Sequence, residues 1–307
     1  MKQPDKTASF ALPDDTPLAR ELADLSARRR ALTEVHVDFP GRTRIMTVSN
    51  QKGGVGKTTT TVNIAAAIAS LGGRVLVIDL DPQGNASTAL GVPHNADTPS
   101  IYDVLIDEFP IAEVVQKSPE SDTLFCVPST IHLAGAEIEL VTQVAREQRL
   151  KTAIDEYLDG LEETIDFILI DCPPSLGLLT INAFTAADEV FLPIQCEYYA
   201  LEGLSQLLGN VRMIQKHLNP RLHLSTILLT MYDGRTKLSQ QVADEVRNHF
   251  ADEVLATMIP RSVRISEAPS FGQTVISYDG NSAGAIAYRE AAVEIVRRGN
   301  APEKGEA

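Results

Sequence analysis

One short stretch of the chain is dense in glycine and lysine and stands between an apolar run and an alanine-rich run. It reads Lys52, Gly53, Gly54, Val55, Gly56, Lys57, Thr58 and Thr59. Glycine lets a backbone curl until successive N–H groups face one anion, and a helix that starts there adds the positive end of its dipole. Lys57 would place its charge beside the β- and γ-phosphates, and the Thr58 hydroxyl is a ligand for Mg²⁺. The stretch predicts a loop, formed by all eight residues, that binds the phosphates of a nucleotide.

Three aspartates end or follow apolar runs that are predicted strands. Asp171 closes the run Asp166–Asp171, and Asp79 and Asp81 come after the run Val75–Ile78. In an open α/β sheet, ligands lie beyond the carboxyl ends of the strands, so these aspartates are expected at one edge with the glycine-rich loop. An apolar strand ending in an aspartate is the Walker B arrangement, in which Asp171 holds Mg²⁺ directly or through water. The sequence therefore predicts a magnesium nucleotide as the ligand.

The elements that position these residues are seven short runs rich in β-branched residues, with helical stretches such as Thr58–Ser70 and Leu201–His217 between most of them. Such alternation predicts βαβ crossovers. The expected fold class is α/β, a single P-loop NTPase domain with a doubly wound, mostly parallel sheet and helices on both faces. The predicted strands are Ile45–Ser49, Val75–Leu80, Leu124–Val127, Phe167–Asp171, Val190–Ile194, Leu224–Thr230 and Val254–Met258.

The chain is expected to have three parts. Residues 1–43 form an N-terminal extension, in which the polar segment Met1–Thr16 is expected to be disordered and the leucines of Pro17–Glu34 indicate one helix. The ATPase domain spans residues 44–298, and residues 299–307 are a polar tail. The extension either recruits a polar scaffold protein or has no such role.

Composition excludes several classes of function. Cys126, Cys172 and Cys196 stand far apart without a CxxC pair, which argues against a zinc site, a disulfide framework or an iron–sulfur cluster. No apolar run reaches the roughly 18 residues that a membrane-spanning helix needs. A cytoplasmic protein is therefore expected.

Charge is unevenly distributed along the chain. The net charge is −14, which argues against a protein that binds nucleic acid in every state. Residues 211–264, however, carry eight Lys and Arg against five Asp and Glu, so this segment is about +3 and the rest about −17. Arg235, Lys237, Arg247, Arg261 and Arg264 lie in it.

The glycine-rich loop departs from the common G-x-x-x-x-G-K-[ST] pattern. Gln51 holds the first glycine position, and a second lysine, Lys52, stands at the mouth of the loop. KGGVGKTT resembles the "deviant" Walker A motif of the ParA/MinD group of ATPases. In the proteins that it resembles, this lysine reaches across a dimer to the partner's phosphates, much as an arginine finger does. The resemblance implies that Lys52 ties hydrolysis to dimerisation.

Asp79–Asn85 resembles switch I of the family. This implies that Asp81 positions or activates the attacking water while Asp79 supports the Mg²⁺ region.

From Arg44 to Arg298 the chain resembles the ParA/Soj family of bacterial DNA-partitioning ATPases. This implies ATP and Mg²⁺ as cofactors, an ATP-dependent homodimer on the nucleoid that binds double-stranded DNA non-specifically, and a ParB-type centromere-binding partner that stimulates hydrolysis. It also places Pro260 and Ser262 beside the adenine, and it places Arg235, Arg261 and Arg264 at or near contacts to DNA phosphates. The alternative for these arginines is that they are surface salt-bridge partners. The segments that carry the resemblance are Asn50–Thr59, Asp79–Asn85, Asp171–Gly177, Gln195–Gly203, Leu229–Lys237 and Ile259–Ser270.

Two other functions stay open at this point. One is a ParA-like ATPase that positions a protein cargo instead of a chromosome or plasmid. The other is a MinD-like division-site regulator, which would bind a membrane through a basic amphipathic helix at its C-terminus. The last predicted helix, Ala283–Arg298, has only Arg297 and Arg298 at its end, so contact with a membrane is not expected.

Overall fold

The computed structural model describes residues 16–197 and 200–299. The predicted disordered segment therefore lies almost wholly outside the described residues, because residues 1–15 are not among them. The same holds for residues 300–307 of the predicted tail.

Two compact units divide the chain, Met1–Val35 and His36–Ala307. The described part of the first unit is helix α1 (Pro17–Thr33). It begins at a proline, whose fixed φ suits the first turn, and the Thr16 hydroxyl accepts a hydrogen bond from the Ala19 N–H at 3.2 Å.

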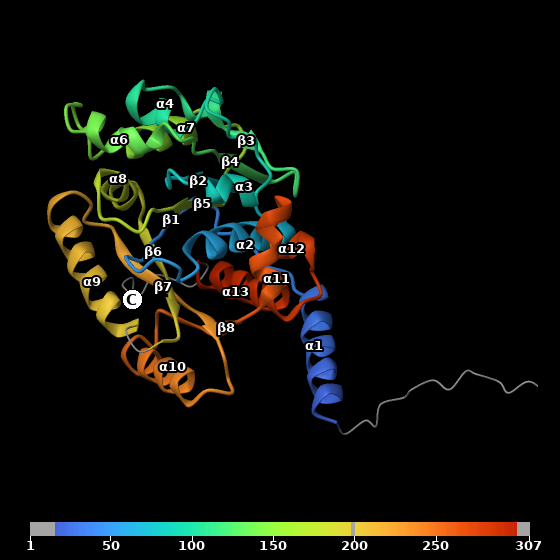
Figure 1. Ribbon diagram of the computed structural model, residues 1–307. Helices are drawn as coiled ribbons and strands as arrows, with labels where there is room; N and C mark the ends of the chain where they lie inside the picture. The colour runs from blue at the N-terminus through green and yellow to red at the C-terminus, as the bar shows by residue number, and fades with distance from the viewer. Residues whose placement is uncertain (1–15, 198–199, 300–307) are drawn as a thin grey trace, which may run out of the picture. The chain divides into compact units, whose positions relative to one another are not determined.

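One sheet of eight strands organises the described residues of the second unit, in the order β3-β4-β2-β5-β1-β6-β7-β8 (Figure 1). All neighbours pair in parallel except β3, which pairs antiparallel with β4 at the edge. Strands such as β5 are buried along their whole length, which explains why they are apolar at successive rather than alternate positions. The strands are β1 (Arg44–Val48), β2 (Val75–Asp79), β3 (Gln116–Lys117), β4 (Leu124–Val127), β5 (Phe167–Asp171), β6 (Glu189–Gln195), β7 (His223–Tyr232) and β8 (Val254–Pro260).

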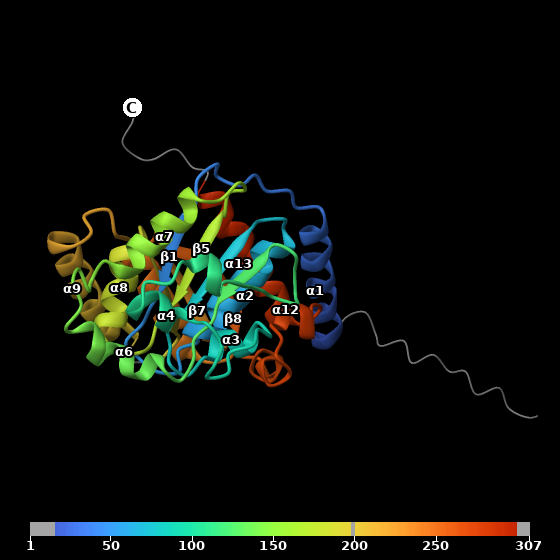
Figure 2. The same ribbon diagram turned by 90° about the horizontal axis from the view of Figure 1, so that it is seen from above.

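Two layers of helices cover the sheet, one on each face (Figure 2). The first layer contains α2 (Lys57–Ser70), α3 (Asn85–Ala89), α11 (Val263–Glu267), η1 (Ala268–Phe271), α12 (Val275–Tyr278) and α13 (Ala283–Gly299). The second contains α4 (Ile101–Ile106), α5 (Ile111–Val114), α6 (Leu133–Leu140), α7 (Arg149–Asp159), α8 (Leu178–Ala186), α9 (Ala200–His217) and α10 (Lys237–His249). Alternate strand residues face the two layers: Met46 and Val48 pack with the first, and Ile45 with the second.

The predicted α/β fold with a mostly parallel, doubly wound sheet is confirmed. All seven predicted strands are present, with bounds within two residues of those expected. β3 was not predicted, because its two residues, Gln116 and Lys117, are polar and carry no hydrophobic pattern.

The order of the strands decides where a ligand can bind. After β1 the chain crosses to β2 on one side, whereas after β5 it crosses over β1 to reach β6. The carboxyl ends of β1, β2 and β5 are level, because Asp171 pairs in register with both Val48 and Asp79. A ligand crevice is expected at such a switch point, directly after β1.

A buried ion pair ties β1 to β6 and gives a first testable prediction. Arg44 donates to both carboxylate oxygens of Glu189, at 2.7 and 2.6 Å, and these side chains are only 6% and 9% exposed. Replacing Arg44 with alanine leaves a buried carboxylate unpaired, so we expect a loss of about 3–5 kcal/mol in the free energy of unfolding, measured in urea. Lys151→Ala, which removes the exposed pair with Asp155, should cost at most about 0.5 kcal/mol.

The same pair should show in the pH dependence of stability. Burial acts to raise the pKa of Glu189, but the hydrogen bonds and charge of Arg44 outweigh it, so the net shift is downward. A lowered pKa means that the stabilisation is present above the ordinary pKa of a glutamate and is lost as the pH falls through the lowered value. Glu189→Gln should remove this acid-side component. An unchanged acid-side slope in that variant would contradict the assignment.

Candidate active site

The backbone of Lys52–Thr59 forms a curl that leads into helix α2. Gly54 and Gly56 have φ of 75° and 89°, in the left-handed region that side chains with a Cβ rarely adopt. A Cβ placed on Gly53 or Gly54 would meet no atom within 4 Å, so space is open above the loop. The loop is fixed from below because the Thr230 hydroxyl, on β7, donates to the Val55 carbonyl at 2.8 Å. These features fit an anion bound at the start of a helix.

Lys57 is the first residue of α2 and is buried, with 7% of its surface exposed. Its ammonium donates to the Lys52 carbonyl at 3.5 Å. Burial lowers the pKa of Lys57, while the nearby charges of Asp171 and Asp81 oppose that shift. Lys57 is therefore placed where its ammonium could pair with a phosphate bound on the loop.

Asp171 ends β5 directly across from the start of α2. The Thr58 hydroxyl donates to one of its carboxylate oxygens at 2.7 Å, and the Thr61 hydroxyl lies 3.0 Å from the other. Burial, followed by the charge of Asp79, raises the pKa of Asp171 to about 8. A hydroxyl and a carboxylate in contact are the oxygen ligands that Mg²⁺ prefers, and a cation there would remove the cost of burying the carboxylate charge. Thr58 and Asp171 therefore fit a magnesium ion.

Asp79 and Asp81 occupy different places in the site. Asp79 is fully buried, and its carboxylate accepts from the N–H and hydroxyl of Ser87, at 2.8 and 2.7 Å, and from the Asp81 N–H at 3.2 Å. Burial raises the pKa of Asp79 to about 6 despite these bonds. Asp81 is partly exposed, and one of its oxygens accepts from the Gln83 N–H at 3.0 Å. Asp79 thus anchors the loop that presents Asp81.

The second lysine of the loop points to a partner far away in the sequence. Lys52 Nζ lies 2.9 Å from Glu197 Oε2, and the two side chains are 39% and 45% exposed. The Glu197 carboxylate also accepts from Gln195 Nε2 at 2.5 Å. The Lys52 N–H donates to the Asn50 side chain at 3.0 Å, so the mouth of the loop is held from two directions.

Pro260 and Ser262 lie at the carboxyl end of β8. Pro260 is in register with Tyr232 of β7, two residues after the Thr230 that bonds to the phosphate loop. Ser262 directly precedes α11. Both residues therefore lie at the carboxyl ends of the strands, as the phosphate loop does. Their contact with an adenine stays a prediction.

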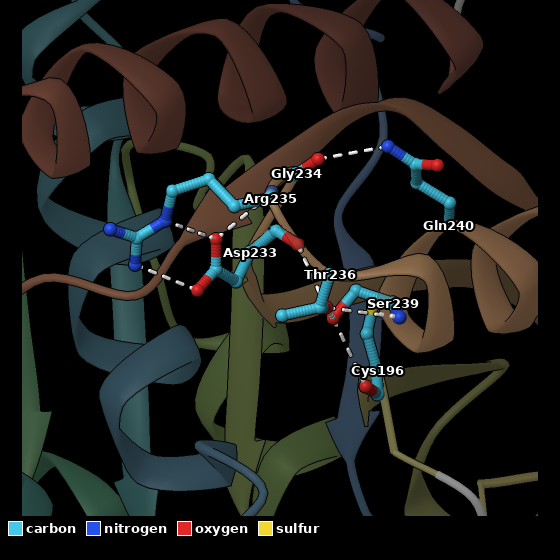
Figure 3. A network of polar contacts seen from close by, with 7 residues as sticks. All are labelled: Cys196, Asp233, Gly234, Arg235, Thr236, Ser239 and Gln240. Carbon is cyan, nitrogen blue, oxygen red and sulfur yellow. Dashed lines mark hydrogen bonds and ion pairs between the residues drawn. The ribbon is translucent and has the colours of Figure 1, made fainter.

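Two of the three candidate DNA-binding arginines are salt-bridged. Arg235 donates through Nε and Nη2 to the two oxygens of Asp233, each at 2.8 Å (Figure 3). Arg264 lies 3.2 Å from Glu267 and 3.4 Å from Asp279. Direct hydrogen bonds from Arg235 lower the pKa of Asp233 to about 2, and the charge of the exposed Arg261 acts in the same direction.

The loop that carries Arg235 is held by polar contacts among its own residues (Figure 3). The Thr236 hydroxyl accepts from the Ser239 N–H at 3.3 Å and caps α10, and Gln240 donates to the Gly234 carbonyl at 2.8 Å. Ser239 also lies 3.5 Å from the Cys196 carbonyl, which precedes Glu197.

Sequence reasoning missed four residues that position the site. Thr61 and Ser87 hold the two buried aspartates, Glu197 pairs with Lys52, and Asp233 pairs with Arg235. Only the last carried a signal, because opposite charges two residues apart in a turn often pair. The others depend on contacts between segments that are distant in the sequence.

Comparison with known proteins gives a consistent family. Residues 43–224 match a family model described as an AAA domain. The chain is 52% identical over 256 residues to the sporulation initiation inhibitor protein Soj of Bacillus subtilis, covering 83% of this chain and 99% of that protein. It is 49% identical over 255 residues to the chromosome partitioning protein ParA of Caulobacter vibrioides, covering 83% and 94%.

A solved structure is similar over the same part of the chain. It is that of cobyrinic acid a,c-diamide synthase from Mycobacterium smegmatis with bound ADP and magnesium, with a TM-score of 0.71 and 40% identity over 83% of this chain and 95% of that one. Its bound groups agree with the ligands that the loop and Asp171 fit here. Identity of about one half over nearly the whole of Soj and ParA, together with this P-loop site, shows that the chain belongs to the Soj/ParA family of chromosome-partitioning ATPases.

Proposed function

We propose that this ATPase is a dimeric switch for chromosome or plasmid segregation. With ATP and Mg²⁺ it pairs with a second copy and binds double-stranded DNA without reading sequence, and a ParB-type partner stimulates hydrolysis and releases it. The observation that carries the proposal is the separation of the two loop lysines. Lys57 is buried next to its own loop, whereas the Lys52 ammonium extends to Glu197 on the partly exposed side. One subunit needs only one lysine for its phosphates, so Lys52 is available to the other.

Four residues of the site would carry out hydrolysis: Lys57, Thr58, Asp81 and Asp171. Bound Mg²⁺ would neutralise developing charge on the phosphate oxygens. Thr58 and Asp171 would hold it, and Lys57 would stabilise the transferred phosphoryl group. Asp81, on the loop anchored by Asp79, would orient the attacking water and accept its proton.

An exposed apolar surface borders this site and supports pairing with a second copy. Ile131, Ile138 and Val141 are 66%, 78% and 55% exposed. The segment that carries them contacts two elements next to the site aspartates. The Ser129 N–H donates at 3.0 Å to Ser87, which holds Asp79, and Glu137 lies against Gly177, in the loop that follows Asp171. Apolar surface of this kind marks an interaction site.

The proposal includes no contact with a membrane. In the described parts of the chain, no helix combines the length and apolar character needed to cross a bilayer. The last helix, α13, packs into the core against α2 and β8, and Arg298 donates to the carbonyls of Asp252, Glu253 and Val254 at 3.0, 2.8 and 2.7 Å. A helix bound in this way does not offer the free amphipathic face that a surface-bound membrane anchor needs.

The test is DNA binding as a function of nucleotide and salt. The protein should bind a random-sequence duplex with ATP and not with ADP. The Asp81→Ala variant should stay bound to the duplex once ATP is added, because it hydrolyses ATP slowly. Affinity should fall steeply with salt, because binding comes from phosphate contacts. Arg235→Ala should lower the salt slope by about 1 per subunit. Arg221→Ala is the control. Arg221 is equally basic and its side chain is 71% exposed, but it lies at the amino end of β7, whereas Arg235 lies beyond the carboxyl end.

Each result decides between specific functions. Equal affinity with ATP and ADP would contradict the switch. Absence of DNA binding in every nucleotide state would favour the alternative in which the ATPase positions a protein cargo. Stimulation of turnover by a ParB-type protein bound to its own DNA site would support segregation as the function.

A further inference from the structure

A groove runs along α7, away from the phosphate loop. Two hollows of about 390 and 130 Å³ open on either side of Ala153 and Glu156, which line both. The larger is walled by α4 and its following loop, and the smaller by the start of α5. Helix α7 spans roughly 16 Å, the length of about five extended residues. Figure 1 shows α4, α6 and α7 gathered at the β4 end of the sheet, opposite α10.

The larger hollow is lined by Arg149, whose side chain is buried and already forms an ion pair. The side chain of Arg149 is 8% exposed and pairs with Glu108 at 2.6 Å and with Gln143 at 3.1 Å. Its buried Nε has no partner among the residues that the structure describes. Apolar side chains line the rest of the hollow together with Glu108, Thr152 and Glu156, and Phe109 is 42% exposed. An apolar side chain entering this hollow would cover Phe109, and the arginine would not attract an anion.

The rim of the larger hollow is held in an unusual backbone conformation. Glu108 and Ala145 have φ of 57° and 49°, in the left-handed region that residues with a Cβ adopt only at a cost. Both residues line the hollow, from two segments that come together only in the fold. Strain that persists at two points of one cavity rim is typical of a binding site.

The segment that forms the groove carries most of the net negative charge of the chain. Residues 101–165, which include α4–α7, carry 14 Asp and Glu against four Lys and Arg, a net charge of −10 out of −14. Glu156, at the centre of the groove, is exposed. Such a field draws in and orients a cationic ligand.

We propose that the groove along α7 is a docking site for a basic peptide segment of a partner protein. The segment carries an apolar side chain that enters the larger hollow, flanked by Lys or Arg that pair with Glu156 and the surrounding carboxylates. The site is separate from the proposed DNA-binding arginines: Arg235 follows β7, and Arg264 belongs to α11, in the helix layer on the other face of the sheet from α7. A docked partner and bound DNA can therefore be present together.

The experiment selects peptides on the full chain without nucleotide. A random library of peptides of about 12 residues, long enough to span α7, is enriched on the wild-type protein and counter-selected on Thr152→Trp, which fills the larger hollow from an exposed position. Enriched peptides should combine Lys or Arg with a large apolar residue. Their affinity is then measured by fluorescence anisotropy on Glu156→Lys and Asp159→Lys. These variants make the same charge change on one helix, but Asp159 lines neither hollow.

Glu156→Lys should weaken binding about tenfold or more, against no more than about threefold for Asp159→Lys. Equal losses in the two variants would mean attraction to a diffuse acidic surface and would overturn the proposal. The proposal would also be overturned if every peptide enriched on the wild-type protein bound equally well to Thr152→Trp. Circular dichroism melts of the three variants exclude unfolding as the cause, and Thr152→Leu serves as a smaller filling variant if the tryptophan destabilises the chain.

Discussion

Asp81→Ala is expected to lower ATP turnover by about 10²–10⁴-fold while leaving ATP binding within about threefold of the wild type, because general-base catalysis supplies an acceleration of that size. The carboxylate of Asp81 is partly exposed, and among the described residues its hydrogen bond is a local one, to the Gln83 N–H. Its removal therefore leaves the phosphate loop, Lys57 and the Thr58–Asp171 contact in place. Turnover is measured by phosphate release, and binding by a fluorescent ATP analogue.

Two controls separate this role from a general effect on the loop. Asp97→Ala removes an exposed aspartate a short distance further along the chain and should change neither quantity. Ser87→Ala removes the hydroxyl bond that anchors Asp79, so it should lower turnover less than Asp81→Ala does and lower stability more. Full turnover in Asp81→Ala would show that another group orients the water.

Lys52→Ala is expected to abolish ATP-dependent dimerisation and to lower turnover by about 10³-fold or more, the range of a cationic finger supplied in trans. Binding of ADP should persist, because Lys57 and the glycines belong to the same subunit. The measurement is light scattering after size exclusion, in an Asp81→Ala background so that hydrolysis does not deplete the dimer. Lys216→Ala, an exposed lysine on α9, is the matched control.

The ion pair of Lys52 with Glu197 sharpens this prediction. In the monomer the pair holds the lysine within its own subunit, at 2.9 Å. Exposed pairs contribute at most about 1 kcal/mol, so Glu197→Gln should tighten the ATP-dependent dimer by no more than about fivefold. A dimer that is weaker in Glu197→Gln would mean that Glu197 positions Lys52 for its partner instead of competing with it. Unchanged dimerisation in Lys52→Ala would remove the basis for a trans-acting lysine.

The proposed peptide groove lies in an acidic part of the chain, whereas the candidate DNA-binding arginines lie in a basic part. Residues 211–264 are about +3, whereas residues 101–165 are −10. A strongly acidic chain can therefore offer a basic surface to DNA. The salt bridge between Arg235 and Asp233 reduces that basic charge in the monomer, so pairing of two copies would be needed for firm DNA binding.

The sequence by itself determined the features whose physics is local. Gly54 and Gly56 are required by backbone conformations that no other residue adopts easily, and the dipole of the helix that follows is a property of the same few residues. Apolar runs bounded by turns were sufficient to locate seven strands, and parallel strands place their carboxyl ends at one edge. The phosphate loop and the aspartates at the strand ends were therefore predictable.

Only the tertiary structure decided how these groups are held. Thr61 and Asp171 are 110 residues apart, and Lys52 and Glu197 are 145 apart. Nothing in either neighbourhood indicates its partner, because such contacts depend on the order and register of the strands. The same is true of Asp79, whose oxygens are committed to Ser87 and Asp81 once α3 turns back over β2. Spacing along the chain identifies groups that can do the chemistry, and the packing of the sheet selects the atoms that orient them.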